Sequence, residues 1–357
     1  MTSRRLDSLD FNRIIAEDLQ RIVASTDLDW SAFDGRRVLI SGASGFLPAY
    51  LVETLLYLNC ARGYDIHVTA LVRNNDNYNK RFQHHLNNPN LSVLVQDISK
   101  PITLDFPHHF IIHAASQASP KYYGVDPVGT LSANVLGTMQ MLELARNHPV
   151  ISFMYFSSGE VYGEVQSVPT KETDYGYVDP TLVRSCYAES KRMGENMCVS
   201  WHAQYHVPTK IVRPFHTYGP GMKLDDGRVY ADFVQDIIEN RPIVVRSEGL
   251  ASRAFCYLAD ATAGFFTVLL KGENAVPYNV GNSEAEISII DLANLLVNLF
   301  PEKKLRVIKE KLKSKSGYLQ STISRNCPDT SRIGSLGWRP RTSLADGFKR
   351  TIESYLI

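Results

Sequence analysis

The sequence predicts an α/β protein built on a doubly wound parallel sheet, with a smaller α/β lobe interleaved toward the C-terminus. Two observations support this prediction. Short apolar runs alternate with helix-like segments as far as residue 213, which is typical of successive β-α-β units. A glycine-rich turn joins the first of these runs to an apolar helix. The alternation implies parallel strands covered by helices on both faces of the sheet.

Composition excludes several classes of protein. The chain has 357 residues, of which 44% are hydrophobic and 21% are charged, and this suits a soluble globular protein large enough for two lobes. A net charge of +1 gives no argument for nucleic acid or an anionic membrane as a partner. No apolar run reaches the roughly 18 residues of a spanning helix, and the N-terminus lacks the apolar stretch of a signal peptide. We therefore expect a cytoplasmic protein with neither kind of partner.

The cysteines and histidines predict neither disulfides nor a metal site. The five cysteines are odd in number and contain no Cys-x-x-Cys pair, so we interpret them as reduced intracellular thiols. The ten histidines show no spacing typical of metal ligands. The pairs His84-His85 and His108-His109 are interpreted as solvent-exposed loop residues.

Three regions are expected along the chain. Residues 1–35 form a helical N-terminal extension, because apolar residues from Ile14 to Val23 recur at helical spacing, with Asp10 as an N-cap. Residues 36–214 form a dinucleotide-binding domain whose sheet is completed by parts of 253–282. Residues 215–357 form mainly a substrate-binding lobe.

A dinucleotide-binding turn is predicted after the first strand, residues 37–41. The turn reads Gly42-Ala43-Ser44-Gly45-Phe46-Leu47-Pro48 and leads into an apolar helix. Glycines let the backbone approach a pyrophosphate, and a helix N-terminus offers free N–H groups. Proline costs little in a first helical turn, where its missing N–H has no partner. The spacing alone would equally fit a structural turn, but its place between strand and helix favours a cofactor site of the Rossmann type.

The ends of the next two strands bear on the choice between NAD and NADP. The strand at residues 66–72 ends at Arg73, and an arginine there can pair with the 2′-phosphate of NADP. Asp76 follows closely, so NAD stays open. The strand at 91–95 leads to Asp97 and Ile98, where Asp97 either accepts from the adenine amino group or is a turn aspartate.

The fourth strand, which begins at Phe110, ends in a loop of small residues that would let a nucleotide or sugar lie close to the backbone. This loop supplies Ala114, Ala115 and Ser116 as candidate cofactor contacts, and Gln117, Ser119 and Tyr122 as candidate substrate contacts. A long helical stretch follows, and Asn134 within it is a further candidate cofactor contact.

The catalytic candidates lie between Tyr155 and Lys191. An apolar run ends in Ser157-Ser158-Gly159-Glu160, and Tyr187 and Lys191 stand four residues apart in a helix-like segment, on one face. An ammonium beside a phenol favours the phenolate, so we expect Lys191 to lower the pKa of Tyr187 from about 10. With the hydroxyl of Ser158, these groups can take a proton from a substrate alcohol while a cofactor takes its hydride. Tyr-x-x-x-Lys is common by chance, but its place downstream of a glycine turn supports catalysis.

The sixth strand, which includes residues 211–213, leads toward two arginines of the C-terminal half. Arg228 and Arg253 can clamp a diphosphate by forked hydrogen bonds, although surface arginines are usually just solvated. A short strand near 276–282 and helical patterns over 287–300 and 344–355 complete the chain.

From Arg37 to Trp338 the sequence resembles extended short-chain dehydrogenases/reductases of the NAD-dependent epimerase/dehydratase family, which act on nucleotide sugars. Its middle is most similar to UDP-glucuronate decarboxylases, on the segments at 115–120, 184–187, 219–222, 226–229 and 253–257. The resemblance implies that Gly42 and Gly45 bind the cofactor pyrophosphate, that Ser158, Tyr187 and Lys191 are catalytic, that Glu160 lies at the sugar, and that Arg228 and Arg253 hold the UDP-like group. The other expected cofactor contacts are Ser44, Phe46, Leu47, Arg73, Asp97, Ile98, Ala114, Ala115, Ser116 and Asn134. The resemblance also implies a homodimer formed through the helices near 127–147 and 186–205.

The sequence departs from the family pattern at three positions. Gly159 stands where 4,6-dehydratases have an aspartic acid and decarboxylases a serine, and a dehydratase needs that acid to protonate the departing C6 oxygen. His216 replaces the asparagine that binds the diphosphate, which leaves the nucleotide open. Arg73 leaves open whether the cofactor is NAD or NADP.

The expected activity is the modification of a nucleotide-diphosphate sugar through transient oxidation at C4. Decarboxylation of UDP-glucuronate is the first hypothesis: the C4 ketone serves as the electron sink, carbon dioxide leaves, and the hydride returns. A 4-epimerase and an NADPH-dependent 4-ketoreductase are the alternatives. A non-catalytic nucleotide-sugar binding protein is a further alternative, against which the intact Ser158, Tyr187 and Lys191 argue.

Overall fold

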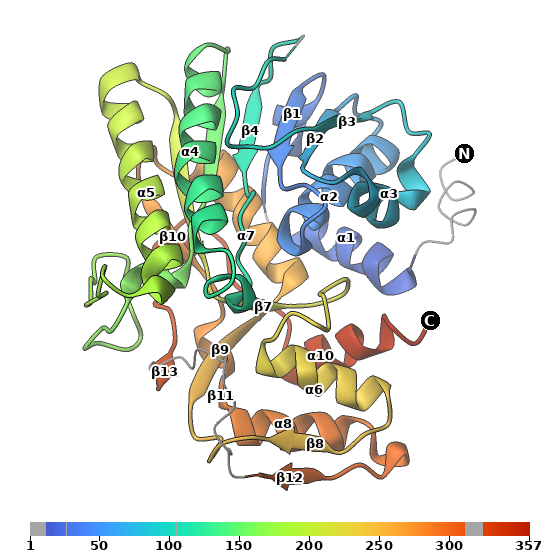
Figure 1. Ribbon diagram of the computed structural model, residues 1–357. Coiled ribbons are helices and arrows are strands. Elements are labelled where there is room, and N and C mark those ends of the chain that lie inside the picture. Colours follow the sequence, from blue (N-terminus) through green and yellow to red (C-terminus); the bar gives the residue numbers. More distant parts are fainter. Residues whose placement is uncertain (1–11, 26, 105, 311–323) are drawn as a thin grey trace.

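The computed structural model describes residues 12–25, 27–104, 106–310 and 324–357, and its main body is a seven-stranded sheet (Figure 1). The strand order is β10-β6-β5-β4-β1-β2-β3, and every neighbouring pair runs parallel. The predicted doubly wound parallel sheet is therefore confirmed. The strands are β1 (Arg37–Ser41), β2 (His67–Val72), β3 (Leu91–Val95), β4 (Phe110–His113), β5 (Ser152–Phe156), β6 (Thr209–Pro214) and β10 (Pro277–Val280).

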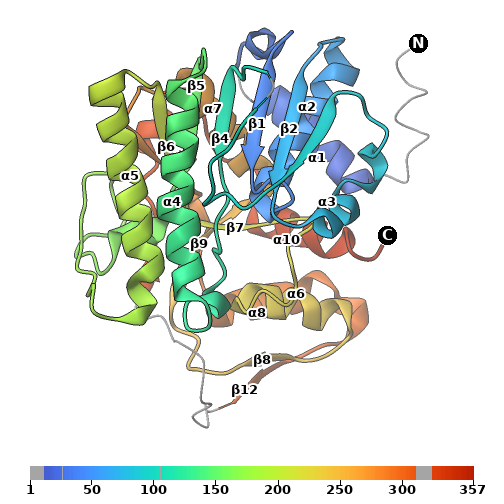
Figure 2. The same cartoon turned by 45° about the horizontal axis from the view of Figure 1, so that its top comes forward.

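Helices cover both faces of this sheet. Successive residues of β1 point to opposite faces, so Val38 and Ile40 belong to one apolar core and Leu39 to another. The first core packs under α1 (Arg13–Ser25), α2 (Phe46–Arg62) and α7 (Leu258–Lys271), and the second under α4 (Pro127–Arg146) and α5 (Cys186–Tyr205). In both views α4 and α5 lie side by side (Figure 2).

The C-terminal lobe lies below the carboxyl ends of the main strands (Figure 1). Its larger sheet has the order β11-β9-β13, with β7 also paired to β9, and a second sheet pairs β8 with β12. Its elements are β7 (His216–Tyr218), α6 (Val229–Ile238), β8 (Ile243–Val245), β9 (Ser252–Tyr257), β11 (Glu286–Ser288), α8 (Ile289–Leu299), β12 (Val307–Lys309), β13 (Arg325–Asn326), α9 (Ser331–Gly334) and α10 (Leu344–Glu353). Since α7 and β10 return to the main sheet between these segments, the two lobes are interleaved in sequence.

Two details of the sequence interpretation are wrong. His108 is buried, with its Nε2 atom 2.8 Å from the hydroxyl of Thr69, and burial lowers its pKa to about 4. His84 and His85 are largely covered and contact the carboxylate of Glu53 instead of facing solvent. In both cases the partner is distant in the sequence, so the local pattern gave no indication of it.

Other features fall where the sequence indicates, or outside the described residues. The N-terminal helix is α1, whereas Asp10, its predicted N-cap, lies outside the described part of the chain. Asn12 accepts hydrogen bonds from the first backbone N–H groups of the helix instead. Across the described ranges, none of the helices combines the length and apolar character needed to cross a bilayer.

A buried ion pair fastens α1 to the rest of the protein. The carboxylate of Asp18 is fully buried and accepts from Arg350 of α10 at 2.7 Å, from Tyr257 at 2.6 Å and from Tyr50 of α2 at 3.1 Å. These hydrogen bonds satisfy a charge whose burial would otherwise be strongly unfavourable. The N-terminal helix is thus joined to both lobes.

Replacing Asp18→Asn should lower the free energy of unfolding by up to about 3–5 kcal/mol, because it removes the fully buried carboxylate from Arg350 and leaves only the partly exposed Glu17 as its charged partner. Urea unfolding followed by circular dichroism measures the change. Asp346→Asn is a matched control, since Asp346 also pairs with an arginine of α1 but is about half exposed, and it should change stability by no more than about 1 kcal/mol. Equal effects of the two substitutions would contradict the assigned role of Asp18.

Candidate active site

A cavity of about 710 Å³ opens at the carboxyl ends of the main strands. It lies where the strand order reverses, since β1 has β2 on one side and β4 on the other. In open α/β sheets this reversal point leaves a crevice in which ligands bind. Both lobes line the cavity, and it gathers most of the predicted site residues. They are Gly42, Ser44, Gly45, Phe46, Leu47, Arg73, Ala114, Ser116, Gln117, Ser119, Tyr122, Ser158, Glu160, Tyr187, Lys191, His216 and Arg228.

The glycine turn between β1 and α2 forms one wall of the cavity. Gly42 has φ +68°, a left-handed conformation that favours glycine, and a Cβ atom there would lie 2.7 Å from the Cα atom of Ala115. Gly45 is the N-cap of α2, so the first backbone N–H groups of that helix are at the cavity. The turn therefore offers a close-fitting backbone surface with donors for an anion.

Ser41 and His113 hold this turn against the end of β4, and sequence reasoning missed both. The hydroxyl of Ser41 accepts from the backbone N–H of Ala114 at 3.1 Å and of Ala115 at 3.2 Å, and lies 2.8 Å from Nδ1 of His113. The only available sequence signal was a polar residue at the end of each of two apolar strands, 72 positions apart.

Ser158, Tyr187 and Lys191 meet at the inner end of the cavity. Ser158 follows β5, and its side chain hydrogen-bonds to Tyr187, whereas Tyr187 and Lys191 both project from α5. The ring of Tyr187 stacks on that of Tyr123, with centroids 4.9 Å apart and planes 16° from parallel. Tyr123 lines the cavity but was not among the predicted site residues.

The expected effect of Lys191 on Tyr187 is wrong for this arrangement. Burial raises the pKa of Tyr187 to about 12, against the hydrogen bond from Ser158, which favours the phenolate. The ammonium of Lys191 donates instead to the carbonyl oxygen of Phe156 at 2.6 Å. Burial also lowers the pKa of Lys191 to about 7, partly offset by the nearby Glu195. Desolvation, which a sequence pattern does not report, dominates both groups.

A buried network positions α5 behind these residues. Glu195 of α5 accepts from Arg213 of β6 at 2.6 Å and 2.8 Å, and from the hydroxyl of Ser157 at 2.5 Å. Arg213 also donates to the hydroxyl of Tyr162 at 2.9 Å. Because the bonded groups lie on α5, on β6 and directly after β5, the network fixes the helix relative to these two strands.

The cavity is also lined by the cation of Arg228 and, among the described residues, by buried polar atoms without hydrogen-bond partners. Arg228 is held by Asp226 at 2.9 Å and by the carbonyl oxygen of Ala118 at 2.9 Å. Within the described residues, Nδ1 of His216, the hydroxyl of Ser116 and the Oε1 atom of Gln117 are buried without a hydrogen-bond partner. Burial, together with the charges of Arg253 and Arg228, lowers the pKa of His216 to about 3, so this imidazole is neutral. Such atoms suit a polar ligand that would satisfy them.

One wall of the cavity has an acidic residue at 160 but no side chain at 159. Glu160 lies 3.5 Å from Arg184. A Cβ atom on Gly159 would lie 3.3 Å from the ring of Phe215, a tight contact that a shift of this ring by a few tenths of an ångström would relieve. Phe215 therefore packs closely against this position.

Five predicted contacts do not line the cavity. Asp97 accepts from the backbone N–H and the hydroxyl of Ser99, as a turn aspartate does, and Ile98 packs against Gly137 of α4. Asn134 is buried and donates to Ser190 of α5 at 2.9 Å. The two others are Ala115, which backs the glycine turn, and Arg253, which donates to the carbonyl oxygen of Ser324 at 3.3 Å.

Both the sequence and the fold are similar to those of known proteins. Residues 38–281 match the profile of the NAD dependent epimerase/dehydratase family. UDP-glucuronic acid decarboxylase 4 of Arabidopsis thaliana is 33% identical over 325 residues, covering 89% of this chain and 68% of that protein. UDP-glucuronic acid decarboxylase 1 of Danio rerio is 31% identical over 325 residues, covering 90% of this chain and 73% of the relative.

Among solved structures, UDP-glucose 4-epimerase of Thermotoga maritima superimposes with a TM-score of 0.74 at 22% identity, covering 90% of this chain and 98% of that one. UDP-glucuronic acid 4-epimerase of Bacillus cereus, solved with UDP-glucuronic acid and NAD, gives 0.71 at 24% identity, covering 89% and 98%. At these identities the two structures establish the shared fold.

Lys191 should make stability depend on pH. Because its pKa of about 7 in the folded protein lies below its unfolded value, the unfolded chain binds more protons between pH 7 and about 10. The burial cost is therefore complete below pH 7 and falls as the pH rises. Lys191→Met removes this cost, so its stability relative to wild type should decrease from pH 7 to pH 9 in urea unfolding. The exposed Lys349→Met controls for loss of a lysine as such, and a pH-independent difference for Lys191→Met would contradict the expectation.

Proposed function

This chain belongs to the NAD dependent epimerase/dehydratase family, and we propose that it is a UDP-glucuronate decarboxylase that uses bound NAD. The observation that carries the proposal is the convergence of Ser158, Tyr187 and Lys191 on a cavity that also contains the glycine turn and Arg228. Relatives named UDP-glucuronic acid decarboxylases, which this sequence matches over about nine tenths of its length, support the choice of substrate.

The residues at the glycine turn fit a dinucleotide. Gly42 leaves room that a Cβ atom would fill, and the N-terminus of α2 is free to donate to a pyrophosphate. When bound, NAD supplies a nicotinamide ring that accepts the hydride and whose positive charge favours the phenolate form of Tyr187. Arg73 lies at the cavity beyond β2 and keeps NADP as the alternative cofactor.

Tyr187 takes the proton of the sugar 4-hydroxyl in the proposed reaction. Its hydrogen bond from Ser158 favours the phenolate, and the stacked ring of Tyr123 holds the phenol in orientation. Ser158 hydrogen-bonds the same substrate oxygen, and Lys191 would bind the cofactor ribose from its buried position beside Phe156. The C4 ketone then accepts the electrons released when the C5 carboxylate leaves as carbon dioxide.

The diphosphate and base of the substrate are proposed to bind at the Arg228 end of the cavity. Arg228 supplies a charged donor, and the neutral His216 offers a ring nitrogen where the family pattern has an asparagine amide. Glu160 faces the sugar. Arg253 keeps its proposed role only if its side chain turns away from the carbonyl oxygen of Ser324.

Gly159 argues against dehydration of the sugar. Dehydratases need an acid here for the departing C6 oxygen, and glycine has no side chain to supply one. A reaction in which the leaving group is carbon dioxide needs no acid at this position.

A homodimer is proposed through α4 and α5. Both helices present apolar side chains to solvent on the face away from the sheet, and these are Leu131, Leu136 and Met139 of α4 and Met193 and Val199 of α5. Exposed apolar patches of this kind mark sites of association.

The reduced cysteines, all five of them free, agree with the proposed cytoplasmic location.

Purified protein incubated with UDP-glucuronate should release carbon dioxide and a UDP-pentose, detected by mass spectrometry, with no net consumption of NAD. Tyr187→Phe should lower the rate by about 10²–10⁴-fold, because it removes the proton acceptor. Tyr177→Phe, at an exposed tyrosine, should leave the rate unchanged.

Other products would contradict the proposal and identify the alternatives. Formation of an isomeric nucleotide sugar without loss of mass indicates a 4-epimerase, and stoichiometric oxidation of NADPH indicates a 4-ketoreductase. If the protein is active with added NADP and inactive with added NAD, the choice of NAD as cofactor is overturned.

The double variant Leu136→Arg, Met193→Arg should be monomeric, because it places charges on both helices of the proposed interface. Light scattering after gel filtration measures the mass of wild type and variant. Val93→Arg, at an exposed position of β3, is the control and should remain dimeric. A monomeric wild type, or a double variant that still dimerises, would remove the proposed interface.

A further inference from the structure

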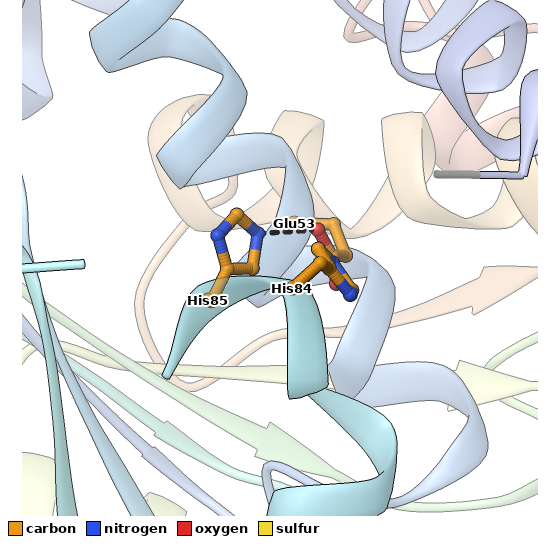
Figure 3. A group of neighbouring side chains, drawn as sticks. All are labelled: Glu53, His84 and His85. Atoms are coloured by element: carbon orange, nitrogen blue, oxygen red, sulfur yellow. Dashed lines mark hydrogen bonds and ion pairs between the residues drawn. The ribbon is translucent and has the colours of Figure 1, made fainter. Parts of the chain in front are cut away.

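Glu53, His84 and His85 form a cluster separate from the active-site cavity (Figure 3). Glu53 comes from the middle of α2, and the two histidines form the end of a 3-10 turn at Gln83–His85, shortly after α3 (Asn75–Arg81). The two carboxylate oxygens of Glu53 each face one Nε2 atom, of His84 and of His85, at 2.9 Å. Glu53 is only 6% exposed, so the cluster is built into the protein rather than gathered by chance on its surface.

We propose that this cluster binds a divalent transition-metal ion, with zinc as the best match. Two imidazole nitrogens and one carboxylate oxygen are ligands that zinc accepts, with water in the fourth position. Imidazole ligands disfavour magnesium and calcium, which prefer oxygen. The donor set therefore selects the class of ion.

The spacing of the donor atoms suits one shared ion. All three lie within 4.8 Å of one another. Ligands at ~2.0–2.2 Å in tetrahedral geometry are separated by roughly 3.3–3.6 Å. To share one ion, each imidazole nitrogen moves about half an ångström away from the carboxylate oxygen that it now contacts at 2.9 Å, and the most widely separated donor pair, now within 4.8 Å, closes by up to about one ångström. Metal entry replaces the protons that now lie between Glu53 and the two rings.

Neighbouring groups can accommodate this exchange. The side-chain amide of Asn88 lies 3.4 Å from Nδ1 of His85. Turning this amide would let its oxygen accept from Nδ1–H once Nε2 is a metal ligand, in exchange for the hydrogen bond that this oxygen now accepts from the backbone N–H of Asn90 at 3.0 Å. Arg81 brings a positive charge to the neighbourhood of Glu53, but its guanidinium donates to the carbonyl oxygen of Gly221 at 2.8 Å.

A bound ion would join two segments that shape the cavity. The helix that carries Glu53 begins at the glycine turn, and α3, which precedes the histidines, contributes Asn77, Lys80 and Arg81 to the cavity wall. The site lies outside the catalytic machinery but fixes two of its supporting elements to each other. It is therefore a structural site, independent of which sugar the enzyme modifies.

Isothermal titration of the EDTA-treated full-length protein with zinc chloride should give one ion per chain. Glu53→Gln, His84→Gln and His85→Gln should each weaken binding at least about tenfold. His67→Gln is the matched control, because His67 also faces a carboxylate, that of Asp65 at 3.2 Å, but has no second histidine, and it should bind zinc like wild type. Zinc at about 100 times the wild-type dissociation constant should raise Tm by ~3 °C in wild type and by less than ~2 °C in each of the three variants.

Cobalt(II) provides a second readout, since its visible bands report a tetrahedral site with nitrogen and oxygen ligands. A Cys60→Ser background removes the exposed thiol on the same helix as a competing ligand. Absence of stoichiometric binding, variants that bind as tightly as wild type, or binding lost only with Cys60 would each overturn the proposal. Circular dichroism in EDTA identifies any variant that fails to fold, and the other two variants then decide.

Discussion

The close approach of Gly42 to Ala115 is the constraint on which the site depends. The turn from β1 into α2 lies directly against the start of the loop that follows β4, and only a residue without a side chain fits between the two backbones. Ser41 and His113 hold that approach with short hydrogen bonds. Because the strand order reverses at this point, the loops on either side diverge, and the space between them becomes the cavity.

The inner end of the cavity shows a conflict between burial and charge. Tyr187 and Lys191 are both withdrawn from water, so without a ligand the phenol is kept protonated and the amine holds its proton weakly. The hydrogen bonds from Ser158 and to Phe156 limit this effect, and Glu195 with Arg213 holds the helix in place behind them. A ligand that brings positive charge and fills the cavity would shift the pKa values of both groups. Binding of the cofactor would therefore change their protonation states.

Much of the fold could be predicted because its signals are local. The apolar strands, the glycine turn and the one-turn spacing of Tyr187 and Lys191 can each be recognised within a few residues, and the structure has them close to the expected positions. The features that were missed depend on contacts across the chain. Asp18 meets Arg350 from the far end of the sequence, and Glu53 meets His84 and His85 across a strand and a helix. The pKa of Tyr187 was misjudged for a related reason, because burial arises from the whole fold and not from a neighbour.

The return of the chain to the main sheet has a consequence for how this protein can diversify. After building much of the second lobe, the chain comes back as α7 and then β10, which covers the outer side of β6. A segment ending at Pro214 would leave β6 as a bare sheet edge and one sheet face without α7, so it is not a module that could be exchanged as a block. Exchanging the second lobe for another would therefore require the replacement to supply its own equivalents of α7 and β10.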